Sequence, residues 1–190
     1  MNIDSIAAGL LAGLDKPQLE RLRQIRLLAL DVDGVLSDGK LYYGNNGEEL
    51  KCFSILDGLG IKLLQDSGIT VAIITGRSSD IVARRAQELG IKHLIQGRED
   101  KAIALAELLD ITGVGLQQTA YMGDDLPDLS AIILSGFGAT VVNGHAVVKQ
   151  YADWVSSCRG GEGAVRELAD VLLAANGKLT QSIEAFVPGS

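Results

Sequence analysis

Short, continuous runs of apolar residues recur along the chain, and each ends at once in glycine or polar residues. The first run, residues 27–30, leads into an Asp-Val-Asp-Gly sequence that begins at Asp31. An apolar run bounded by turn-forming residues is typical of a strand buried on both faces of a sheet. Similar runs at residues 69–75 and 119–122 predict two more buried strands. Three shorter strand candidates lie at residues 93–95, 139–142 and 153–155.

Between these runs, apolar residues recur at the spacing of a helix. Ser78 or Ser79 can cap one such helix, and Gly90 can end it. Strands that alternate with helices predict an α/β protein with an open, three-layer architecture and a mainly parallel sheet. Helices are expected at residues 60–66, from 78 or 79 to 89, at 99–109 and at 164–175, with another that begins near Pro127.

Two parts of the chain stand outside this alternation. Asn46-Gly47 lies between two short β-prone runs, which is the strongest short-range signal for a hairpin, so we expect a flap at about residues 39–53. Residues 1–25 read as a helical arm interrupted by Pro17. We therefore divide the chain into this arm, a main domain at residues 26–176 that includes the flap, and a tail at residues 177–190.

Composition narrows the functions that the fold can serve. The formal net charge of −7 over 190 residues argues against a nucleic-acid or anionic-membrane surface. A secretory signal needs a lysine or arginine before its apolar stretch, and none precedes the apolar residues 6–14. Glycines interrupt the uncharged residues 129–148, which argues against a membrane span. Cys52 and Cys158 have no metal-type spacing and are expected to be buried thiols. We expect a soluble, cytoplasmic protein with a small-molecule partner, no nucleic acid and no membrane.

The polar residues that end the strands are candidates for a functional site, because ligands of open α/β sheets bind beyond the carboxyl ends of the strands. Asp31 and Asp33 can project to the same side of the chain. Two carboxylates in one crevice are costly unless a cation lies between them, and Mg²⁺ prefers such oxygen ligands. The residues expected at this edge are Asp31, Asp33, Thr75, Gly76, Arg77, Lys101, Asp124 and Asp125.

Acids that bind Mg²⁺ beside a cation and backbone N–H groups form a phosphate site. A carboxylate can attack phosphorus and give an aspartyl-phosphate, which water then hydrolyses. Asp31 would be the nucleophile, and Asp33 would protonate the leaving alkoxide and later activate water. Thr75 and Lys101 would hold the phosphoryl oxygens. Asp124 would anchor the metal.

Each of these residues also has a structural interpretation. Thr75 suits a strand as a β-branched residue, and Lys101 could be a solvated lysine at a helix start. The Gly-Asp-Asp sequence at Asp124 is a common turn from a strand to a helix, and Asp125 could be a metal ligand or lie behind the ligands. The joint order of the motifs along the chain favours the catalytic interpretation.

The motifs are four in number: Asp-x-Asp-Gly at Asp31, Thr-Gly at Thr75, Lys101, and Gly-Asp-Asp at Asp124. They resemble those of the haloacid dehalogenase-like phosphatases, and the resemblance covers nearly all of residues 25–176. The resemblance implies a Rossmann-like fold and the catalytic roles given above, with Mg²⁺ held by Asp31, the main-chain carbonyl of Asp33, and Asp124. The connections between the motifs are too short for a cap domain. The hairpin, the Ile-Ile-Thr-Gly-Arg sequence and a late Gly-Ala-Val-Arg-Glu are similar to members that act on an eight-carbon keto-deoxy sugar acid 8-phosphate in lipopolysaccharide synthesis. Related members act on a nine-carbon 9-phosphate.

The resemblance also implies a homotetramer, with hairpins meeting at its centre and C-terminal tails reaching a neighbour's site. The alternative is a hairpin that packs on its own domain. Two departures leave the tail contact and the choice of substrate open: Glu162 stands where the family often has a basic residue, and Lys62 where a relative has arginine. The implied substrate-binding residues are Ser54, Asp57, Gly58, Lys62, Gly76, Arg77 and Arg85.

Two other classes of protein compete with this hypothesis. A signalling receiver domain also gathers acids, a threonine or serine, and a lysine around Mg²⁺. In a receiver the lysine closes the set, whereas here an acid pair follows Lys101. A catalytically silent binding domain would not need all four motifs.

Overall fold

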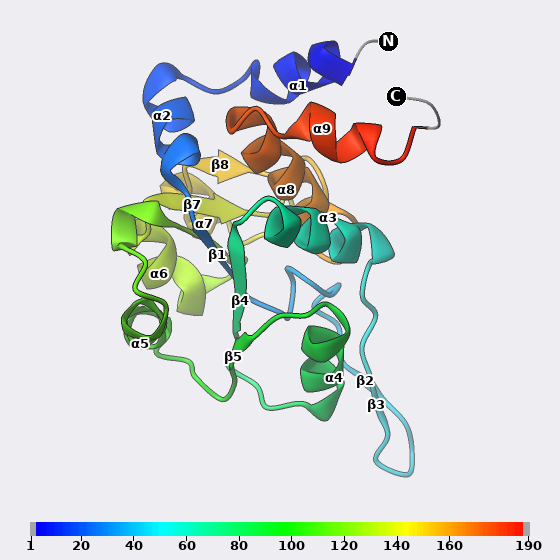
Figure 1. Cartoon of the computed structure of the whole chain (residues 1–190). Coiled ribbons are helices and arrows are strands. Elements are labelled where there is room, and N and C mark those ends of the chain that lie inside the picture. The colour runs from blue at the N-terminus through cyan, green and yellow to red at the C-terminus, as the bar shows by residue number, and fades with distance from the viewer. Residues whose placement is uncertain (1–2, 188–190) are drawn as a thin grey trace.

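A computed structural model of the chain describes residues 3–187. Within this range, six strands form one parallel sheet in the order β5-β4-β1-β6-β7-β8 (Figure 1). The open, three-layer α/β fold predicted from the sequence is thereby confirmed. The strands are β1 (Leu27–Leu30), β4 (Thr70–Ile74), β5 (His93–Ile95), β6 (Thr119–Met122), β7 (Phe137–Thr140) and β8 (Trp154–Val155).

The first strand of the sheet along the chain, β1, lies at its centre. All four of its residues are buried, and Leu28 is in register with Val71 of β4 on one side and Ala120 of β6 on the other. A continuous apolar run suits this position because both faces of the strand are covered. The residue that follows β1 is Asp31, so the central strand delivers it to the middle of the carboxyl edge.

Helices cover both faces of the sheet. One apolar cluster packs α2, α3, α4 and α8 against the first face, and a second packs α5, α6 and α7 against the other. No helix in residues 3–187 is long and apolar enough to cross a bilayer. The helices are α1 (Ile3–Leu11), α2 (Lys16–Gln24), α3 (Ile55–Asp66), α4 (Asp80–Glu88), α5 (Lys101–Thr112), α6 (Leu129–Leu134), α7 (Ala146–Tyr151), α8 (Ala164–Ala175) and α9 (Leu179–Glu184), with 3-10 turns η1 (Leu116–Gln118) and η2 (Leu126–Asp128).

Several helix and strand boundaries differ from the predictions. Helix α3 begins at Ile55, well before residue 60, because Ser54 Oγ accepts hydrogen bonds from the N–H groups of Leu56 and Asp57. Of the implied substrate-binding residues, Ser54 is therefore the cap of a helix, and Asp57 and Gly58 lie in its first turn. Strand β7 begins two residues earlier than predicted, and helices α7 and α9 were not predicted at all.

Pro17 lies in the first turn of α2 and does not interrupt a helix. Asp15 caps α2 in a reciprocal pair of hydrogen bonds with Gln18, and proline is well suited to the first helical turn that follows. Helix α1 lies beside α9 at the same end of the molecule (Figure 1), where Thr180 Oγ1 donates to Asp4 Oδ1 at 2.9 Å. The division of the chain into arm, domain and tail stays a prediction.

The flap is a short hairpin of β2 (Tyr42–Tyr43) and β3 (Glu49–Leu50) that projects from the body of the molecule (Figure 1). Asn46 and Gly47 lie at its tip, as the sequence predicts, and Gly47 has a φ of 88°. In residues 3–187 no cap domain accompanies it, as predicted. The expectation of buried thiols was wrong, since Cys52 is exposed and Cys158 half-buried.

Candidate functional site

The carboxyl ends of β1, β4 and β6 surround a cavity of about 300 Å³. The cavity contains all eight residues that the sequence places at this edge of the sheet. Gly39, Glu99, Pro127 and Asp128 also line it and were not predicted. The predicted lining residues are Asp31, Asp33, Thr75, Gly76, Arg77, Lys101, Asp124 and Asp125.

Lys101, the first residue of α5, is buried in this cavity and contacts three oxygens. Its ammonium group donates to Asp31 Oδ1 at 2.5 Å and to the Ile74 carbonyl at 2.7 Å, and it lies 3.3 Å from Asp128 Oδ1. A lysine buried to this degree needs such partners because its charge has lost its hydration. The contacts hold its ammonium group against the carboxylate that we expect to be the nucleophile.

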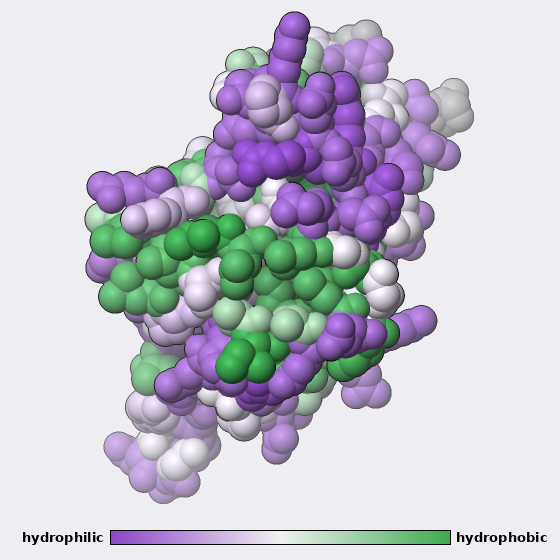
Figure 2. Space-filling model, turned by 90° about the vertical axis from the view of Figure 1, so that its left-hand side faces the viewer, coloured by the Kyte–Doolittle hydropathy of each residue, from purple (hydrophilic) through white to green (hydrophobic). Residues whose placement is uncertain are grey.

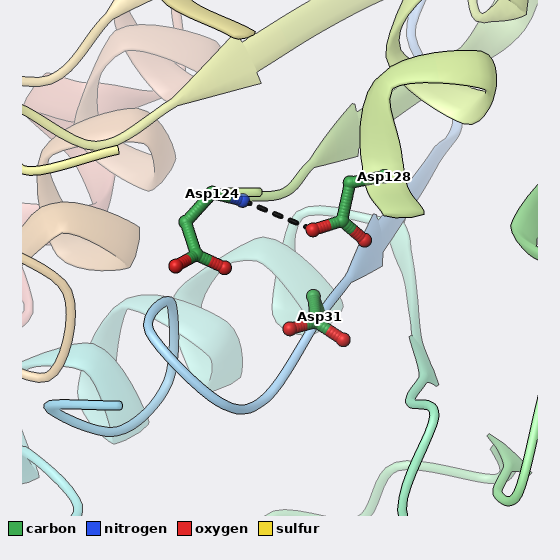
Figure 3. Close-up of side chains that lie close together, drawn as sticks. All are labelled: Asp31, Asp124 and Asp128. Carbon is green, nitrogen blue, oxygen red and sulfur yellow. Dashed lines mark hydrogen bonds between the residues drawn. The ribbon is translucent and has the colours of Figure 1, made fainter. Parts of the chain in front are cut away.

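Three carboxylates converge beside Lys101. Asp31, Asp124 and Asp128 each place one carboxylate oxygen within 4.8 Å of the others (Figure 3). Asp31 follows β1, whereas Asp124 and Asp128 follow β6. The Asp124 N–H donates to Asp128 Oδ2 at 3.1 Å, and the buried Tyr121 hydroxyl donates to Asp128 Oδ1 at 2.8 Å. Asp128 is thus fixed from two sides.

Burial and the negative charges nearby make Asp31 and Asp124 hard to ionise. Burial, followed by the charge of Asp128, raises the pKa of Asp31 to about 7 against the opposing effect of Lys101. Burial, followed by the charges of Asp31, Asp128 and Asp125, raises the pKa of Asp124 to about 7. One lysine does not neutralise this cluster. An all-oxygen donor set with excess negative charge fits a hard divalent cation such as Mg²⁺.

Gly34 follows Asp33 where no other residue fits. Its φ is 98°, and a Cβ atom there would lie 2.1 Å from Asp124 Oδ2. The glycine-rich segment near the C-terminus covers the same turn: a Cβ on Gly160 would lie 1.7 Å from the Gly34 carbonyl oxygen. The Gly161 N–H donates to the Val35 carbonyl at 2.8 Å. The glycines of this segment therefore hold the loop that carries Asp31 and Asp33.

Asp33 lies half-buried at the cavity, where it forms an ion pair with Lys51 from the end of the hairpin. Sequence reasoning missed Lys51, because a lysine beside a hairpin is normally solvated. It also missed Asp128. The available signal was an acid one turn after Asp124, behind a proline, where the chain curls back to the carboxyl edge.

The other implied substrate-binding residues lie outside the lining of the cavity. The buried Asp57 carboxylate accepts from the N–H groups of Gly163 at 3.3 Å and Arg166 at 2.8 Å, so it joins α3 to the start of α8. Arg85 donates to the Ser54 carbonyl at 3.3 Å beside Gly58. Lys62 is exposed on α3. Asp125 caps η2 through its carboxylate. The substrate roles of Ser54, Asp57, Gly58, Lys62 and Arg85 stay predictions, as does the metal role of Asp125, which lines the cavity.

Comparison with known proteins places the chain in a family. Residues 93–168 match the haloacid dehalogenase-like hydrolases. The 3-deoxy-D-manno-octulosonate 8-phosphate phosphatase KdsC of Escherichia coli (strain K12) is 48% identical over 164 residues, which cover 86% of this chain and 87% of that protein. This chain belongs to the haloacid dehalogenase-like hydrolases. The resemblance inferred from its four motifs is thereby confirmed.

Solved structures of similar proteins share the fold of this hydrolase. A probable YrbI family phosphatase from Pseudomonas syringae pv. phaseolica 1448a has a TM-score of 0.90 and 46% identity, covering 93% of this chain and 100% of its own. The 3-deoxy-D-manno-octulosonate 8-phosphate phosphatase of Moraxella catarrhalis has a TM-score of 0.87 and 47% identity, covering 88% and 97%. That structure is a complex with a magnesium ion, a phosphate ion and a KDO molecule.

Proposed function

We propose that this hydrolase is a Mg²⁺-dependent phosphatase that releases phosphate from 3-deoxy-D-manno-octulosonate 8-phosphate in lipopolysaccharide synthesis. The observation that carries the proposal is the contact between the buried ammonium of Lys101 and the Asp31 carboxylate, inside a cavity whose acids are under-neutralised. The identity of 48% to KdsC supports the substrate. Free Cys52 and Cys158 support a cytoplasmic location, where thiols stay reduced.

The proposed reaction has two steps. In the first, an Asp31 carboxylate oxygen forms a bond to phosphorus, the bond from phosphorus to the sugar oxygen breaks, and Asp33 gives its proton to the leaving alkoxide. In the second, Asp33 takes a proton from a water molecule whose oxygen attacks phosphorus, which releases phosphate and restores the Asp31 carboxylate. Lys101 and the Thr75 hydroxyl hold the phosphoryl oxygens in both steps.

The acids at the cavity fit the metal that this chemistry needs. Asp31, Asp124 and the main-chain carbonyl of Asp33 would hold Mg²⁺, with Asp128 behind them. When bound, the cation neutralises the negative charge of the acids and of the phosphoryl group. Tyr121 keeps Asp128 in place through its hydroxyl hydrogen bond.

A screen of phosphate release over sugar phosphates with six to nine carbons tests the proposal. We expect the eight-carbon keto-deoxy sugar acid 8-phosphate to give the highest kcat/KM in the presence of Mg²⁺. The nine-carbon 9-phosphate as the better substrate would correct the substrate and leave the reaction unchanged. No turnover of any sugar phosphate would overturn the proposed function.

We further propose a homotetramer in which the hairpins of neighbouring subunits meet. Tyr43 and Leu50 of the hairpin are each 66% exposed, although both are large and apolar. A second exposed apolar band lies on the face formed by α5 and α6 (Figure 2), and it includes Ile111 at 67% and Ile133 at 52%. Apolar patches of this kind are typical of surfaces that another chain covers.

Light scattering tests the assembly. We expect a mass of about four times that of the 20.0 kDa chain. Replacement of Tyr43 and Leu50 by serine should lower that mass, while the same change at Tyr151, which is exposed on α7, should not. A monomeric wild-type protein would contradict the tetramer and the shared site that it implies.

A further inference from the structure

A buried lysine joins the hairpin to the cavity of its own subunit. Lys51 follows β3, and its side chain is only 2% exposed although it is charged. Its ammonium group forms an ion pair with the Asp33 carboxylate and lies 3.9 Å from Glu49 Oε1. Lysine is almost never fully buried without a partner. The two carboxylates therefore account for its position.

A second cation connects the hairpin to the rim of the cavity. Arg77 Nη2 lies 3.5 Å from Glu49 Oε1 and 3.5 Å from the Tyr43 hydroxyl. Glu49 thus lies between two cations, one at the cavity rim and one beneath the hairpin. A chain of alternating charges runs from Arg77 through Glu49 and Lys51 to Asp33. Such a chain restricts each side chain more than an isolated pair would, because each charge holds the next.

We propose that Lys51 is a positioning residue for phosphoryl transfer, which fixes the Asp33 carboxylate where it meets the leaving oxygen. The inference rests on the proposed function. Within residues 3–187, the Lys51 ammonium is the one hydrogen-bond donor to the Asp33 carboxylate. Without it that carboxylate could turn about its side-chain bonds, and a misplacement of about 1 Å can cost on the order of 10²-fold in rate.

The proposal gives the hairpin a role inside its own subunit. Tyr43 and Leu50 are exposed and available to a neighbour, whereas the Lys51 ammonium contacts Asp33 of the chain that carries it. The geometry of Asp33 therefore depends on how the hairpin lies against the body of the protein. Contacts that hold the hairpin in place also hold the group that handles the proton.

The test compares three variants of the full-length protein in the presence of Mg²⁺. Lys51→Met keeps the length of the side chain and removes its charge, and we expect kcat to fall by roughly 10- to 100-fold with KM within about threefold of the wild type. Lys51→Arg keeps the charge and should recover part of the loss. Lys40→Met is the matched control, because Lys40 lies in the same hairpin with a side chain 71% exposed. It should behave like the wild type.

The leaving group gives a readout that a general loss of structure would not produce. Release of a sugar alkoxide needs a proton from Asp33, whereas release of p-nitrophenolate in the first turnover does not. In a rapid-mixing experiment, Lys51→Met should therefore slow the first turnover of the sugar phosphate more than the p-nitrophenolate burst. Equal slowing of both would overturn the positioning role.

The remaining outcomes distinguish a failure of the proposed function from a failure of the inference about Lys51. A wild-type protein without phosphatase activity would refute the proposed function itself. An active wild type with an unchanged kcat in Lys51→Met would refute only the inference, as would a loss confined to KM. If urea unfolding shows that Lys51→Met does not fold, Glu49→Gln tests the same chain of charges, because the half-buried Glu49 is the other carboxylate beside Lys51. That variant should lower kcat several-fold, and a kcat equal to that of the wild type would refute the inference.

Discussion

Asp31→Asn is expected to abolish phosphate release, with kcat lowered by roughly 10⁴- to 10⁶-fold, as for other single nucleophiles. The amide has nearly the shape of the carboxylate but cannot form the bond to phosphorus. The fold should remain intact. Burial and repulsion from Asp128 raise the pKa of Asp31, so an uncharged side chain relieves a cost of the metal-free protein. Steady-state kinetics and thermal unfolding measure the two effects.

A matched substitution separates the loss of the nucleophile from the loss of any carboxylate. Asp110→Asn makes the same chemical change at the exposed, opposite end of α5, and both kcat and Tm should match the wild type. Activity that survives Asp31→Asn would contradict the aspartyl-phosphate. It would indicate that water attacks phosphorus directly, with Asp31 as a metal ligand only.

The fold was largely predictable because its strands are simple in sequence. The run that forms β1 is apolar throughout, the run that forms β6 is apolar after Thr119, and both end in turn residues, so hydrophobicity locates them. The prediction failed where glycines lie inside elements. Gly58 and Gly60 lie in the first half of α3, and Gly138 lies inside β7, where a Cβ atom would meet Ile132 at 2.7 Å. There tertiary contacts override the local preference of glycine.

The candidate site was predictable where topology fixes it. Asp31, Thr75 and Asp124 each follow a parallel strand, and parallel strands deliver their carboxyl ends to one edge. Lys51 and Asp128 could not be found this way, because one arrives from the hairpin and the other from a turn. Asp57 is a different case, and its substrate role stays a prediction. Its implied substrate role was transferred from the family, whereas its buried carboxylate binds the first turn of α8.

Removal of Mg²⁺ is expected to abolish activity and to change how stability depends on pH. In the metal-free protein, burial raises the pKa of Asp31 and of Asp124 to about 7 from the ordinary value of 3.8. Between these values the folded state binds more protons than the unfolded state, so the free energy of unfolding falls as pH rises from about 4 to about 7. Below about pH 4 this loss of stability is absent, and above about pH 7 it is complete. Thermal unfolding in EDTA across this range measures it.

Added Mg²⁺ should reverse this loss, because the cation binds the ionised acids of the folded state. At a hundred times its Kd, a ligand adds about 2.7 kcal/mol. For a chain of this size that raises Tm by roughly 5–10 °C, and the rise should be larger at pH 8 than at pH 5. Asp124→Asn should remove most of the rise while increasing metal-free stability at pH 8, since it relieves the repulsion from Asp31. If Mg²⁺ raises Tm equally in Asp124→Asn and Asp110→Asn, the ion binds elsewhere and the acid cluster is not the metal site.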